Sequence, residues 1–248
     1  MAEPRHNKGF TLAEVLITLG IIGVVAALTI PTLIQNYKTR ETVSRLKKTY
    51  SEVNEAIKLA VIENGPISHW GLTNSAYDTS EENKDKHIIT DETVKSLDLF
   101  LDNILKYLKV TERRTYAEYG QLNDYGIDSY TILADGIIID GVHFQSANCR
   151  AKYGKIENIC GDIYFKMYKT TPTADSSNGV ERFVFWITDT GLVPRGHRLA
   201  EDSTDAFEKN CIKGNYKYSC TGWVIENGNM DYLKCPEELS WDGNHECK

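Results

Sequence analysis

A long apolar run near the N-terminus constrains this chain of 248 residues more than any other feature. The run extends over 25 residues, from Phe10 to Ile34, and carries a single charge, on Glu14. As an α-helix with a rise of ~1.5 Å per residue it would be roughly 37 Å long, which is enough to cross a bilayer with some tilt. The run therefore predicts a transmembrane helix, and its simplest interpretations are a membrane anchor or a secretory signal.

Helical periodicity does not stop where the apolar run ends. A signal peptide cut at residues 24–26, Val-Val-Ala, would release a chain that starts near Ala27. The pattern nevertheless continues from Thr32 to Glu63 without a break, and the leader that precedes the run, residues 1–9, is only weakly basic. One continuous helix is therefore the better interpretation.

Glu14 is the unusual residue of the run. A carboxylate inside a membrane costs ~2.5 to 3.5 kcal/mol on insertion scales, so an acid at such a position is rare unless it has a function. A simple anchor has no use for it. Glu14 is thus a functional candidate that needs a partner.

The stretch from Gly9 to Glu14, GFTLAE, resembles the cleavage and methylation signature of type IV pilins and type II secretion pseudopilins. The resemblance implies that a prepilin peptidase of the membrane cuts after Gly9 and N-methylates Phe10. Three positions at which this family has characteristic assembly residues are matched here by Glu14, Gly23 and Pro31. Beyond the long helix the similarity is loose.

A cut after Gly9 would create an amine on Phe10, four residues from Glu14 and on the same face of the helix. Two opposite charges become tolerable in lipid when they pair, so a pair between neighbouring subunits would favour assembly. A head-to-tail interface that does not close into a ring gives an open helical filament. The resemblance also implies that the helix can unwind between Gly23 and Pro31, although Pro31 could mark an ordinary kink at the membrane edge.

The second half of the helix, residues 35–63, is amphipathic. Its apolar residues recur every three or four positions, at Val43, Leu46, Tyr50, Val53, Ile57 and Ala60. We expect this half to lie against a globular head formed by residues 64–248. The head carries 20 lysines and arginines against 29 aspartates and glutamates, which does not fit a nucleic-acid surface.

Basic residues and cysteines predict opposite orientations of the chain in the membrane. Basic residues near the span number two before it, Arg5 and Lys8, and five after it, Lys38, Arg40, Arg45, Lys47 and Lys48, which would keep the head in the cytoplasm. The six cysteines, Cys149, Cys160, Cys211, Cys220, Cys235 and Cys247, form no CxxC pair and favour disulfides in an oxidising compartment. With the leader motif, they predict a head outside the cytoplasm. Of 15 possible connectivities we expect neighbours in order, which closes loops of 10, 8 and 11 residues.

The head reads as α+β, an antiparallel sheet on the long helix followed by a disulfide-bearing C-terminal region. Asn64-Gly65-Pro66 should end the long helix, and residues 67–90 should form an exposed loop with Trp70 as a packing anchor. A second helix is expected from Asp91 to Lys109, capped by Asp91. Strands are predicted at Ser129–Ala134, Ile137–Phe144, Gly161–Lys169 and Arg182–Thr188, with turns at Asp135-Gly136 and residues 189–191 and a short helix at Thr204–Asn210.

Candidate ligand and catalytic residues are few. Asn227, Asn229, Asp231 and Glu238 have the alternation of a calcium loop, but Tyr232 stands where the turn needs glycine and Pro236 stiffens it; the loop around Asp175, Asn178 and Gly179 is a slightly better calcium candidate. His69, His87, His143, His197 and His245 lack metal-ligand spacing, and a dyad of Cys149 with His143 is less favoured than a structural disulfide. No metal, cofactor or catalytic residue is therefore predicted.

The sequence predicts a structural subunit of a type IV pilus-like filament. Its expected partners are the prepilin peptidase, other pilin or pseudopilin subunits, an assembly platform of the inner membrane, and lipid. Two alternatives stay open: a pseudopilin of a type II secretion system, and a membrane-tethered binding module whose leader is never cut. A secreted enzyme with an ordinary signal would instead start near Ala27.

Overall fold

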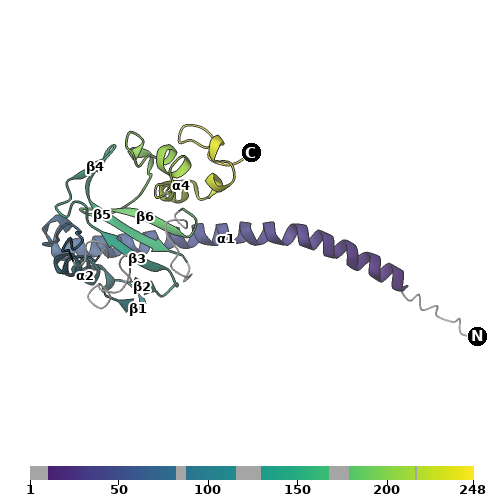
Figure 1. Ribbon diagram of the computed structural model, residues 1–248, viewed down its shortest axis with the longest axis horizontal. Coiled ribbons are helices and arrows are strands. Elements are labelled where there is room, and N and C mark those ends of the chain that lie inside the picture. The colour runs from purple at the N-terminus through teal and green to yellow at the C-terminus, as the bar shows by residue number, and fades with distance from the viewer. Residues whose placement is uncertain (1–10, 82–87, 116–129, 168–178, 216) are drawn as a thin grey trace, which may run out of the picture. The chain divides into compact units, whose positions relative to one another are not determined.

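The computed structural model describes residues 11–81, 88–115, 130–167, 179–215 and 217–248 (Figure 1). Several of the predictions above depend on residues that lie outside the described ones, namely Gly9, Phe10, His87, Asp175 and Asn178.

The long N-terminal helix is continuous. Helix α1 runs from Leu12 to Asn64 with Pro31 inside it, which confirms the single helix expected from the periodicity. It ends as predicted, because Gly65 follows with a φ of 79°, a left-handed conformation that glycine adopts without strain. Within the described residues, α1 is the helix long and apolar enough to cross a membrane.

The chain divides into two compact units within α1. One ends at Glu41, and the other runs from Thr42 to Lys248 and contains the whole sheet. The second half of α1 is therefore an element of the head.

The head is built on an antiparallel sheet in the order β1-β2-β3-β5-β6-β7, with β4 paired to β5 (Figure 1). The strands are β1 Val110–Arg114, β2 Tyr130–Leu133, β3 Ile138–His143, β4 Ala151–Tyr153, β5 Ile156–Lys166, β6 Arg182–Thr188 and β7 Gly191–Pro194. The predicted hairpin is present, since β2 and β3 flank Asp135 and Gly136, and Gly136 has a φ of 81°. The sequence analysis missed β1, β4 and β7.

Helix α2 spans Asp91–Leu105 and corrects two predictions. Its N-cap is Thr90 rather than Asp91, because the Thr90 side chain accepts a hydrogen bond from the Thr93 backbone N–H at 3.3 Å. It also stops at Leu105, before the predicted end at Lys109, and the chain turns there into β1.

One face of the sheet packs against α1 and α2. The predicted apolar stripe of α1 is buried, with Leu46, Val53, Ile57 and Ala60 fully excluded from solvent. Tyr50, which is half-buried, stacks on Phe185 of β6 with ring centroids 5.1 Å apart. Phe165 and Phe183 join the same core cluster. The amphipathic half of α1 thus serves as the central support of the sheet.

The segment that follows α1 is less exposed than expected. A 3₁₀ helix occupies Ile67–His69, and Ile67 is fully buried. Trp70 is the predicted packing anchor: it is 9% exposed and its indole N–H donates to the carbonyl of Gly65 at 2.9 Å. The prediction of an exposed loop over residues 67–90 was therefore wrong at its beginning, where apolar contacts outweigh the polar composition.

The C-terminal region forms a layer of short helices. The predicted helix at Thr204–Asn210 is a π-helix at Phe207–Ile212, and helix α4 at Cys220–Asn227 was missed. Three 3₁₀ helices complete the region, at Arg198–Ala200, Asp231–Leu233 and Pro236–Glu238. Phe207 stacks on Trp223 with ring centroids 4.3 Å apart. The Thr221 hydroxyl accepts the backbone N–H of Val184 at 2.9 Å, which joins α4 to β6.

Candidate assembly interface

The first half of α1 exposes an unusual amount of apolar surface. Its large apolar side chains are between 41% and 78% exposed, namely Leu12, Val15, Leu16, Ile17, Leu19, Ile21, Ile22, Val24, Val25, Leu28, Ile30, Leu33 and Ile34. A contiguous apolar surface of this kind marks contact with lipid or with another protein.

Glu14 lies at the start of this surface and has a local partner. Its Oε2 accepts hydrogen bonds from the backbone N–H and the hydroxyl of Thr11, both at 2.8 Å. The Glu14 backbone N–H donates to the Thr11 hydroxyl at 3.3 Å. This reciprocal arrangement is a capping box, and the Thr-x-x-Glu spacing could have predicted it from the sequence. Phe10 is not described, so its proposed pair with Glu14 stays a prediction.

Gly23 and Pro31, the other two predicted assembly residues, lie inside the unbroken helix. A Cβ added to Gly20 or Gly23 would meet no described atom within 4 Å, so this stretch of the helix offers space for a close neighbour. Pro31 has no backbone N–H, which leaves the carbonyl of Ala27 without its usual helical donor. Unwinding between Gly23 and Pro31 stays a prediction.

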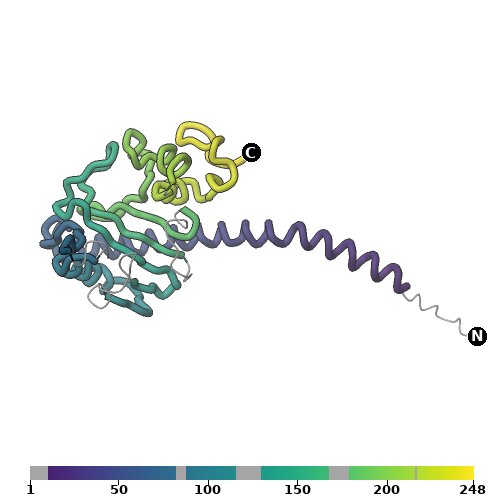
Figure 2. Tube along the Cα trace, viewed as in Figure 1, coloured from purple at the N-terminus to yellow at the C-terminus, as the bar shows by residue number. Residues whose placement is uncertain are grey.

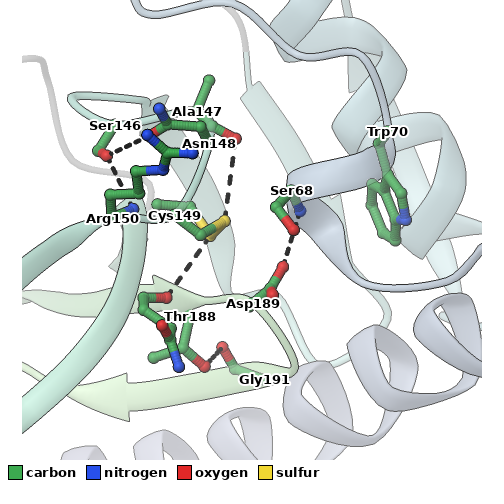
Figure 3. Close-up of a disulfide and its surroundings, with 12 residues drawn as sticks. Ser68, Trp70, Ser146, Ala147, Asn148, Cys149, Arg150, Thr188, Asp189 and Gly191 are labelled. Atoms are coloured by element: carbon green, nitrogen blue, oxygen red, sulfur yellow. Dashed lines mark hydrogen bonds between the residues drawn. A yellow bond between two sulfur atoms is a disulfide. The ribbon is translucent and has the colours of Figure 1, made fainter.

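The six cysteines form three disulfides between neighbours in the chain, which confirms the expected pairing. They join Cys149 to Cys160, Cys211 to Cys220 and Cys235 to Cys247. The Asp189 carboxylate lies near the first pair: one of its oxygens and the sulfurs of Cys149 and Cys160 all lie within 4.8 Å of one another. Both sulfurs are bonded to each other, and the carboxylate accepts the backbone N–H of Ser68 at 2.7 Å (Figure 3). The group therefore acts as a structural cross-link, and Cys149 has no free thiol for a dyad with His143.

Two of the four residues weighed as a calcium loop, Asn229 and Asp231, serve the fold of the C-terminal tail. The side-chain oxygen of Asn229 accepts the indole N–H of Trp223 at 2.9 Å and the backbone N–H of Asp231 at 3.1 Å. The carboxylate of Asp231 accepts the backbone N–H of Cys247 at 3.0 Å. Tyr232 is buried, and its hydroxyl donates to the carbonyl of Gly179 at 2.6 Å. These oxygens hold the tail together.

A buried cluster of charges was missed by the sequence analysis. Arg195, which follows β7, bonds Asp205 at 2.7 Å and Asp162 of β5 at 3.4 Å, and both acids are nearly buried. Burial raises the pKa of Asp162 to about 6, because desolvation outweighs the attraction of Arg195. An aspartate inside the apolar strand GDIYF was the available signal. The cluster ties the C-terminal layer to the sheet.

The described histidines are not gathered into a catalytic group. Burial lowers the pKa of both His143 and His197. His197 borders a cavity of about 270 Å³ together with Tyr50 and Glu226, and Glu226 pairs with Arg198 at 3.4 Å.

Comparison with known proteins agrees with the motif at the N-terminus. The model of a prokaryotic N-terminal methylation motif matches residues 4–30, and the model of a family of unknown function, DUF6613, matches residues 32–228. A type IV major fimbrial protein FimA of Dichelobacter nodosus is 43% identical over 57 residues, which are 23% of this chain and 36% of that protein. A fimbrial protein of Pseudomonas aeruginosa is 40% identical over 63 residues, 25% of this chain and 40% of that protein. The similarity thus spans well under half the length of either relative, and no solved structure matches significantly.

Proposed function

Because this chain belongs to the DUF6613 family of unknown function and begins with the methylation motif of type IV pilin-like proteins, we propose that it is a structural subunit of a type IV pilus-like filament. The prepilin peptidase cuts it after Gly9 and methylates Phe10. Subunits then assemble through the first half of α1.

The exposed apolar surface of α1 with Glu14 at its start carries this proposal. Along Leu12–Ile34 none of the residues is buried within the described part of the chain, so we expect this stretch to need lipid before assembly and other subunits after it. A plain anchor accounts for the apolar side chains, but it has no use for the charge of Glu14 beyond the capping of the helix start. A filament interface accounts for both.

The proposal also sets the location and the partners of the chain. The subunit spans the inner membrane once, with the disulfide-bonded head outside the cytoplasm, where disulfides persist. Its partners are the prepilin peptidase, other pilin or pseudopilin subunits, the assembly platform and lipid. No catalytic role is proposed for the head.

Two related functions share these features. A pseudopilin of a type II secretion system would have the same N-terminus, and a tethered binding module would retain its leader. The relatives named above are fimbrial proteins, which favours a pilus.

The test is the mass of the N-terminal peptide of the full chain, isolated from membranes of cells that contain a prepilin peptidase. We expect a peptide that begins with Phe10 and is heavier by one methyl group. A start near Ala27 would mean ordinary secretion and exclude the filament. An intact leader would favour the tethered module.

A further inference from the structure

The disulfide between Cys149 and Cys160 closes a basic hairpin at one side of the head. The loop contains β4 and the first residues of β5, and three exposed cations project from it, Arg150, Lys152 and Lys155. Lys152 pairs with Glu157 at 2.5 Å, whereas no ion pair joins Arg150 or Lys155 to a described residue. The head as a whole is acidic, so this local excess of positive charge stands out.

The hairpin is held firmly against the head. The Lys155 backbone N–H donates to the carbonyl of Leu199 at 2.8 Å. Gly154 has a φ of 59°, and a Cβ there would meet that same carbonyl at 2.5 Å. Tyr153 stacks on Trp186 with ring centroids 5.2 Å apart. The cations are therefore presented on a rigid support, which lowers the entropy lost on binding.

A second disulfide loop has the opposite charge. Cys235 and Cys247 enclose 11 residues that include no lysine or arginine but four exposed acids, Glu237, Glu238, Asp242 and Glu246. In Figures 1 and 2 this loop lies at the C-terminal end, away from β4 and its hairpin. No ion pair links the two loops in the part of the chain that the structure describes.

We infer that the basic Cys149–Cys160 loop is a docking surface for the acidic Cys235–Cys247 loop of a second copy of this chain. The charges are complementary, and their separation on one head prevents them from meeting within a copy. A contact between two different surfaces of identical chains is heterologous, so it can repeat from copy to copy without closing. The inference rests on the proposed function and adds a contact between heads to the helix interface.

The test is zero-length carbodiimide cross-linking of full-length chains in membranes and in sheared filaments, at low salt, with the joined peptides identified by mass spectrometry. We expect a dimer band in which Lys152 or Lys155 is joined to an acid of residues 237–246. Because the contact is exposed, its yield should fall as salt is raised. Arg150→Glu with Lys155→Glu should lower the yield about tenfold, because the surfaces then repel each other.

The controls separate this contact from folding and from net charge. Adding Glu237→Lys and Glu238→Lys to the first pair should restore the dimer, whereas Lys95→Glu with Lys109→Glu changes the charge equally and should leave it unchanged. Non-reducing gels verify the three disulfides in every variant. Normal filaments without the loop-to-loop cross-link would overturn this inference and spare the proposed function, whereas an uncut leader would overturn the function. Unchanged cross-linking in the Arg150→Glu, Lys155→Glu variant would also overturn it.

Discussion

The two halves of α1 have the same secondary structure but opposite environments. From Leu12 to Glu41 no residue is buried, whereas from Thr42 to Asn64 eight residues are buried. The second half is stabilised by its own head, and the first half has to gain its stabilisation from lipid or from other chains. The comparison teaches that one helix can combine a segment packed into a folded domain with a segment whose apolar surface stays exposed.

The difference follows from the pattern of residues. Within the first half, Leu12–Ile34 is apolar around the helix except for Glu14 and a few threonines, as suits a membrane helix, while the second half has one apolar stripe with charges between its members. A substitution should therefore affect assembly in the first half and folding in the second.

The largest effect is expected from Glu14→Leu. In the proposed filament, the change removes the charge with which Glu14 would pair with a neighbouring subunit, so we expect filaments to be lost while the head keeps its stability. Filament yield after shearing and thermal unfolding of the detergent-solubilised chain measure the two effects separately.

Glu14→Gln separates the charge from the capping box. A glutamine oxygen can still accept the two hydrogen bonds from Thr11, but it carries no charge. Loss of filaments in both variants supports the charge pair. Normal assembly with glutamine would mean that capping of the helix is what matters, and normal assembly with leucine would show that assembly needs neither the charge nor the capping box.

A smaller, graded effect is expected from truncation in the second half. Ile57→Ala removes fully buried atoms between α1 and the sheet and should lower the free energy of unfolding by ~2 to 5 kcal/mol. Ile22→Ala is the matched change at a residue 62% exposed, and it should alter head stability by less than about 0.5 kcal/mol. Denaturant titration in micelles, followed by tryptophan fluorescence, compares them. Equal losses would contradict the division of α1 into two environments.

The sequence predicted the parts of the molecule that depend on local signals. The stripe from Val43 to Ala60, the end of α1 at Gly65 and the hairpin at Asp135-Gly136 each follow from periodicity or from one backbone requirement. The pairing of cysteines with their neighbours is also local, because it closes short loops.

The features that were missed depend on contacts between distant segments. Strand β7 has four residues and is held by the side chain of Asn54, whose oxygen accepts the backbone N–H of Leu192 at 2.8 Å. The cluster of Asp162, Arg195 and Asp205 joins residues that are far apart in sequence and are brought together by the sheet and the C-terminal layer, so the aspartate in GDIYF did not identify its partners. The opposite charges of two disulfide loops became visible only when their places on the head were known.

The smallest effect is expected for the pH dependence of the free energy of unfolding of the head. The first half of α1 should not contribute to this pH dependence. The pKa of Asp162 is raised to about 6 in the folded chain, above its ordinary value of 3.8, so the folded state binds this proton more tightly than the unfolded state. Asp162 therefore favours folding at pH 4 and below, and this contribution is lost as the pH rises through 6.

Asp162→Asn removes the titration, although it also weakens the contact with Arg195. We expect the stability of the wild type relative to the variant to fall by on the order of 1 to 3 kcal/mol between pH 4 and pH 7, in denaturant titrations at each pH. Parallel pH profiles would show that Asp162 stays ionised in the fold, and that Arg195 fully offsets the cost of its burial.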